Sequence, residues 1–255
     1  MQNVVGIFHS GEAARDACER VRALGVPEDH LNLLLPGESV TQEAAQTDAE
    51  QPGVGTALGT IVGGAAGAAS GVAVAAALLI PGAGPVAAIG GGAVALLSAL
   101  GAVSGAAAGA ITGSALDRKL QHGLPTDELY VYEDALRQNR SIVLVQTDDR
   151  FNGDTIRDTL VAAGAETVDA AREQWWVGRR SAEQEEYLAD GRDFDHDELP
   201  YRHGFEAAHS SELRDTSYET ALPLLRERYP DEYSTEAFRR GFESGHKRRH
   251  ETFVI

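Results

Sequence analysis

The feature that most constrains this chain is a segment without a charged residue, from Gly53 to Leu116, built mostly of Gly, Ala and Val. Its glycines recur every fourth residue in two ladders. Residues four apart share one face of an α-helix, so each ladder predicts a stripe along which another backbone can approach closely. The first ladder is Gly55, Gly59, Gly63, Gly67 and Gly71, and the second is Gly101, Gly105, Gly109 and Gly113.

The sequence PGAGP at residues 81–85 separates the two ladders and predicts a turn. Folding the segment about Gly84 brings the glycines of one ladder opposite those of the other. We therefore expect residues 53–116 to form a glycine-zipper helical hairpin with small-xxx-small packing. Two environments would suit it. Each arm exceeds the roughly 20 residues that span a bilayer, and the hairpin could equally be buried between the subunits of a homo-oligomer.

Charge and cysteine usage narrow the class of protein. The formal net charge of -17 repels phosphate, so nucleic acid is not an expected partner. Cys18 is the single cysteine, which excludes an internal disulfide and fits a reducing compartment. The first residues lack the basic and apolar regions of a signal peptide. We expect a cytoplasmic protein, with both hairpin ends on the cytoplasmic side if it meets a membrane.

Hydrophobic periodicity on either side of the uncharged segment predicts an α/β (α+β) fold. Removing that segment leaves the order strand, helix, strand, strand, helix, strand, which is the ferredoxin-like βαββαβ pattern. This domain would comprise residues 1–52 and 117–178, with the hairpin inserted between its second and third strands. The expected strands are 2–9, 30–35, 142–145 and 165–172, and the expected helices are 11–24, 125–139 and 152–163.

The remaining residues, 179–255, contain an internal repeat. The segment Tyr201–His209 (YRHGFEAAH) returns as Phe238–His246 (FRRGFESGH). Both copies and residues 216–228 between them are expected to be helical. The sequence therefore predicts a small all-α repeat module.

Each copy of the repeat contains Glu-x-x-His, a spacing that puts both side chains on one helix face. The pairs are Glu206 with His209 and Glu243 with His246. Such pairs on two helices, joined by a Glu from each of two others, build di-iron sites, and Glu186 and Glu219 would be the further ligands. A metal-binding module is therefore the alternative to solvated surface pairs.

The arrangement resembles the bacterial general stress proteins of the heat-induced YflT type, also called low-temperature-induced proteins. The resemblance is carried by the opening VVGIF, by the Gly/Ala segment with IPGAGP, and by YEDAL followed by SIVLV. The YRHGFE and FRRGFE units are similar to repeats appended in some members. The resemblance implies a stress-linked, non-catalytic role.

No reaction is predicted. No Ser lies with His and Asp in a nucleophile motif, and Gly53-x-Gly55-x-x-x-Gly59 does not follow a strand as a phosphate-binding loop does. We therefore expect no cofactor and no small-molecule substrate. The expected function is stress-linked self-assembly, membrane association, or both, through the hairpin, with metal binding by the repeats as the alternative.

The zipper is tested by substituting one glycine in each ladder. Gly63→Leu and Gly105→Leu are expected to disrupt assembly, because the new side chains would hold the paired helices apart. Light scattering measures the assembly mass. An unchanged mass in both variants would refute the zipper.

Overall fold

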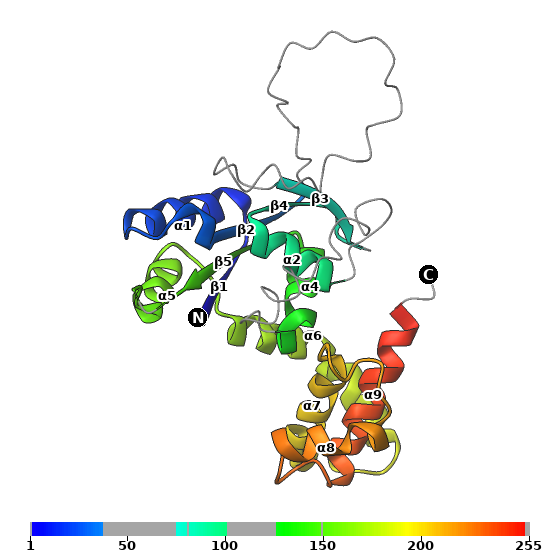
Figure 1. Ribbon diagram of the computed structural model, residues 1–255. Coiled ribbons are helices and arrows are strands. Elements are labelled where there is room, and N and C mark those ends of the chain that lie inside the picture. Colours follow the sequence, from blue (N-terminus) through cyan, green and yellow to red (C-terminus); the bar gives the residue numbers. More distant parts are fainter. Residues whose placement is uncertain (1, 38–74, 81, 101–125, 149, 253–255) are drawn as a thin grey trace, which may run out of the picture. The chain divides into compact units, whose positions relative to one another are not determined.

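The computed structural model describes residues 2–37, 75–80, 82–100, 126–148 and 150–252 (Figure 1). The chain divides into two compact units. The first, the α/β unit, comprises Met1–Pro125 and Tyr132–Val168. The second, the helical module, comprises Thr126–Val131 and Asp169–Ile255, so it begins earlier than the expected boundary after residue 178.

The described elements follow in this order. The strands are β1 (Gln2–Phe8), β2 (Leu31–Pro36), β3 (Ala75–Ile80), β4 (Gly84–Ile89) and β5 (Ser141–Thr147). The α-helices are α1 (Gly11–Ala23), α2 (Gly91–Ala99), α4 (Leu129–Arg137), α5 (Gly153–Ala162), α6 (Val168–Ala189), α7 (Phe194–His209), α8 (Tyr218–Arg228) and α9 (Glu236–Thr252). Short 3-10 turns precede β2 at Glu28–His30 and α4 at Thr126–Glu128.

The α/β unit is built on a five-stranded sheet with the order β1-β5-β2-β4-β3. All described neighbours pair antiparallel. Strand β5 lies between β1 and β2, so these two strands run parallel to each other with α1 as their crossover. The mixed α/β class expected from the sequence is confirmed.

The two faces of the sheet have different covers. Helices α1 and α5 lie side by side on one face (Figure 1). Their apolar residues join alternate strand residues in one core, because successive strand side chains point to opposite faces. This core includes Val4, Phe8, Ala17, Cys18, Val21, Leu33, Val143, Val145, Ile156 and Leu160. Cys18 is buried in this core, and its burial raises the pKa of the thiol to about 11.

The chain turns within residues 81–85 as expected, but the segments on either side of this turn are strands rather than the expected helices. Residues 75–89 form the β3–β4 hairpin, and β4 pairs with β2 in the sheet. Ala83 N–H donates to the Ile80 carbonyl at 3.0 Å, and Gly82 and Gly84 have φ of 84° and 74°. Positive φ at both positions suits a tight turn between strands. No ladder glycine falls between Gly71 and Gly101, so the short apolar runs flanking the turn are free to be strands.

The last expected strand, 165–172, is also wrong. It contributes one isolated bridge, in which Ile7 and Glu166 exchange backbone hydrogen bonds of 3.0 and 2.8 Å. The carboxylate of Glu166 pairs there with the buried Arg140. Helix α6 begins at Val168, because the following residues are good helix formers. Trp175 and Trp176 consequently lie inside this helix.

A buried asparagine on the second face of the sheet fixes the start of α2. Asn32 is 1% exposed, and its Oδ1 accepts hydrogen bonds from Gly92 N at 2.6 Å and Ala93 N at 3.3 Å. Its Nδ2 donates to the Leu144 and His30 carbonyls. A strand residue therefore caps this helix across the layers.

All nine glycines of the two ladders lie outside the described residues. Among the helices that the structure describes, none combines the length and apolarity needed to cross a membrane.

Adjacent glycines test the Asn32 cap. A Cβ at Gly92 would lie 2.8 Å from Asn32 Oδ1, whereas one at Gly91 would meet nothing within 4 Å. Gly92→Ala is expected to lower the free energy of unfolding by about 1–2 kcal/mol, since the hydrogen-bonded amide has no room to shift. Gly91→Ala should leave it unchanged or slightly raised. Urea unfolding followed by far-ultraviolet circular dichroism measures both, and equal stabilities would contradict the cap.

Candidate functional site in the helical module

The repeated glycines of the module let two helices cross with their backbones in contact. A Cβ at Gly204 in α7 would lie 2.0 Å from the Phe238 carbonyl oxygen, and one at Gly241 in α9 would lie 1.9 Å from the Tyr201 oxygen. Each glycine thus faces the first residue of the other copy of the repeat. The repeat therefore specifies a reciprocal crossing of α7 and α9 that tolerates no side chain.

The remaining repeated residues have matching roles in the two copies. His209 lies 4.8 Å from the Phe205 ring, and His246 lies 4.8 Å from the Phe242 ring, between centroids. The two glutamates also match, as each binds the arginine one turn earlier on its own helix. These pairs are Arg202–Glu206 at 2.7 Å and Arg239–Glu243 at 2.8 Å. The Glu-x-x-His spacing follows from this packing.

The structure does not bring the metal-site candidates together. Nδ1 of His209 is 2.8 Å from the Phe205 carbonyl oxygen. The further candidates Glu186 and Glu219 form ion pairs with Lys247 and Arg239. Within the described part of the chain, no group of three or more His, Cys, Asp or Glu side chains is arranged to hold a metal ion. The metal hypothesis gains no support from the geometry.

The duplication extends to the helices before each copy, which the sequence analysis missed. Trp176 of α6 lies edge-on to Phe205 at 5.7 Å, and Tyr218 of α8 lies edge-on to Phe242 at 5.6 Å. Further along, Tyr187 packs on Tyr201 at 5.0 Å, as Tyr229 packs on Phe238 at 5.1 Å. The module is thus two related helix pairs, α6–α7 and α8–α9. Matching residues are 42 apart between α6 and α8 but 37 apart between α7 and α9, so no single offset aligns the two pairs.

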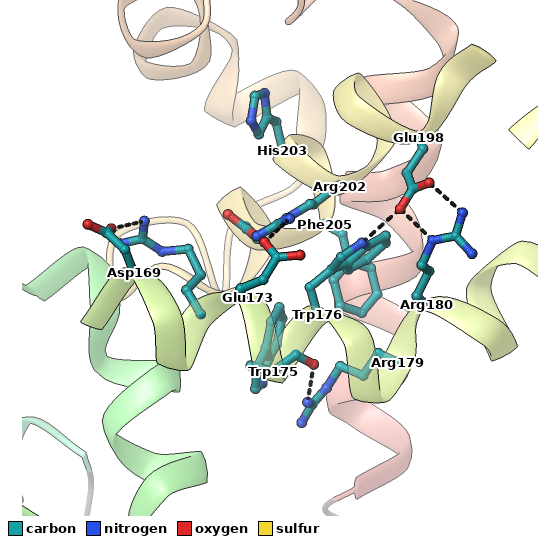
Figure 2. A network of polar contacts seen from close by, with 12 residues as sticks. Asp169, Glu173, Trp175, Trp176, Arg179, Arg180, Glu198, Arg202, His203 and Phe205 are labelled. Carbon is teal, nitrogen blue, oxygen red and sulfur yellow. Dashed lines mark hydrogen bonds and ion pairs between the residues drawn. The ribbon is translucent and has the colours of Figure 1, made fainter. Parts of the chain in front are cut away.

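Polar contacts fix α6 against α7 (Figure 2). Glu198 accepts a hydrogen bond from Trp176 Nε1 at 3.1 Å and two from Arg180 at 2.6 Å each. The Arg180 guanidinium, aided by the indole N–H, holds the pKa of Glu198 below its ordinary value. Glu173 binds Arg202 at 2.6 Å further along the same interface. The hydrogen bond from its indole N–H orients Trp176.

One of the buried positions at which the two helix pairs differ holds a carboxylate. Glu183 of α6 is 2% exposed, and it occupies the place that Leu225 occupies in α8. Its Oε2 accepts hydrogen bonds from Tyr201 Oη at 2.8 Å and Ser244 Oγ at 2.6 Å. Its Oε1 accepts one from Arg248 Nε at 2.8 Å. One half of the module thus buries a hydrogen-bonded carboxylate where the other half buries an alkyl side chain.

A cleft of about 190 Å³ adjoins this carboxylate, between α6, α7 and α9. The buried rings of Tyr187 and Tyr201 line it together with Ser244. Charged side chains complete the lining: Glu186, Asp190, Arg240, Glu243 and Lys247. Burial and the hydrogen bond to Asp197 raise the pKa of Tyr187 to about 12, so this ring stays neutral. The cleft is the candidate functional site of the module.

Comparisons of the chain with family models, with curated proteins and with solved structures give no match.

The helix crossing is tested by adding a methyl group at its centre. Gly204→Ala and Gly241→Ala are each expected to destabilise the module by about 3 kcal/mol, because the new carbon would meet backbone atoms. Gly178→Ala, in α6 with nothing within 4 Å, should be neutral or stabilising. Tryptophan fluorescence during urea unfolding measures the effect in the module alone, because both tryptophans of the chain lie in α6. Equal midpoints for Gly204→Ala and Gly178→Ala would contradict a tight crossing.

Proposed function

We propose that this chain is a non-enzymatic stress-response protein, of the type that it resembles, which assembles with copies of itself through the uncharged region of residues 53–116. The α/β unit anchors this region, and the helical module is an appended rigid unit. The proposal assigns no reaction to the chain. It places the protein in the cytoplasm, with attachment to a membrane as the alternative use of the same region.

The edge strand β3 is the observation that supports assembly. Strand β3 is the last strand in the order and pairs with β4 on one side only among the described strands. Its sequence, AAALLI, holds no charge and no proline. Edge strands of monomeric proteins are normally blunted by lysine, proline or bulges, because open backbone groups recruit further strands. An apolar edge that no described strand covers favours pairing with β3 of a second copy.

We further infer that the α/β unit is ferredoxin-like. Two split βαβ halves require β1 and β2 to be parallel with β5 between them, which matches the strand order. The bridge of Glu166 to Ile7 stands where the last strand would pair with β1. On this interpretation, β3, β4 and α2 belong to the insertion and extend the sheet beyond β2.

Lysine at the sheet edge tests the assembly. Ala76→Lys and Ala77→Lys are expected to reduce the mass in solution toward the 27.0 kDa monomer, because a charge opposes pairing at an open edge. Neighbouring strand residues face opposite sides, so the two variants together test both faces. Size-exclusion chromatography with light scattering gives the mass.

Leu24→Lys is the matched control. This residue caps α1 and is 45% exposed, so the same charge is added away from the edge and should leave the mass unchanged. A wild-type monomer at micromolar concentration would contradict the proposal. If that monomer floated with lipid vesicles, the membrane alternative would replace assembly.

A further inference from the structure

The internal duplication supplies a comparison within one chain. Positions that pack the helices are alike in the two copies, whereas several positions at the cleft differ. Tyr201, Arg240 and Ser244 line the cleft, and their counterparts in the other copy are Phe238, His203 and Ala207. Leu225 packs with Phe238 and Ala207 in one apolar cluster. The polar set around Glu183 therefore replaces an apolar packing that the same architecture accepts.

Stability alone does not explain this replacement. Burying a carboxylate costs desolvation free energy, and apolar substitutes for buried ion pairs are often neutral or stabilising. The chain itself contains such a substitute in Leu225, which is fully buried. The carboxylate of Glu183 is instead used to orient groups beside the cleft.

The Glu183 carboxylate fixes the direction of two hydroxyl protons, and this decides what the cleft can bind. Ser244 Oγ and Tyr201 Oη each donate their single proton to Glu183. A hydroxyl that has given its proton offers only lone pairs to other partners. Ser244, which is half-buried at the cleft, is therefore held as a hydrogen-bond acceptor. The carboxylates of Glu186, Asp190 and Glu243 add further acceptors.

The charges of the cleft favour a cation. Arg240 pairs with Asp190 at 2.5 Å, and Glu186 binds both Lys247 at 2.7 Å and Arg248 at 2.9 Å. Arg248 also binds Glu183, so these three cations of α9 are matched by carboxylates. The lining holds the three carboxylates of Glu186, Asp190 and Glu243 and the two cations of Arg240 and Lys247, so it carries one negative charge in excess. Arg239, which pairs with Glu243, lies outside the lining. The chain as a whole carries -17, which raises the local concentration of cations.

We propose that this cleft binds a short aliphatic diamine or polyamine. The ammonium groups would bind the wall carboxylates, Glu243 above all, and the acceptor Ser244. The methylene chain would lie on the rings of Tyr187 and Tyr201, whose faces also attract cations. A cleft of about 190 Å³ suits a ligand of this size.

Isothermal titration calorimetry of the full chain with putrescine and with spermidine tests the site at constant ionic strength. One saturable site per chain is expected. Glu243→Gln should weaken binding about tenfold through loss of a charge-assisted hydrogen bond. Ser244→Ala, which installs the residue of the other copy, should also weaken it severalfold. Tryptophan fluorescence verifies that each variant is folded.

Glu206→Gln is the matched control, because Glu206 is the counterpart of Glu243 and has the same arginine pairing but lies outside the cleft lining. Its affinity should equal that of the wild type. Absence of saturable binding, or equal weakening by Glu206→Gln and Glu243→Gln, would overturn the proposal. Equally tight binding of Mg²⁺ would also overturn it, as it would indicate general attraction to an acidic surface.

Discussion

The contact between the backbones of α7 and α9 is the constraint on which the helical module depends. At Gly204 and Gly241 there is no space for a β-carbon, so the two helices meet at one fixed point. Side chains on either side of this point then have defined neighbours. Phe205 packs on Trp176, and Phe242 packs on Tyr218. Arg202 lies over the Trp176 ring, and Arg239 lies over the Tyr218 ring. The aromatic core and the ion pairs between helices follow from the closeness of that crossing.

The same crossing explains how the two copies of the repeat can share one architecture and still differ in their buried side chains. Both halves need the glycine, the phenylalanine and the aromatic residue that begins the repeat. Positions next to these are free to differ as long as volume and hydrogen bonding are satisfied. One half has an apolar cluster around Leu225 at these positions, and the other half has a carboxylate network around Glu183. A buried polar group of this kind is retained only when every partner is present, which ties its neighbours into one set.

Much of the architecture could be predicted from local pattern, and the failures have physical causes. Alternation and helical spacing identified β1, α1 and β5, and repeat matching placed α7 and α9. The segment Ala75–Ile89 was misassigned because Ala, Leu and Gly without polar neighbours carry no period that separates helix from strand. The network around Glu183 was missed because its partners Tyr201 and Ser244 come from different helices, and only the tertiary crossing brings them together.

The cap on α2 also closes a site that the local architecture would otherwise offer. A strand, a run of glycines and a helix follow one another at β4, Gly90–Gly92 and α2, an order that in many proteins cradles a phosphate on the exposed N–H groups of the helix. Here the carboxamide oxygen of Asn32 lies at those N–H groups and takes the place of an anion. The side chain of Asn32 therefore fills the position at the start of α2 where an anion would otherwise bind. This glycine-rich turn is a joint between two layers rather than a nucleotide-binding loop.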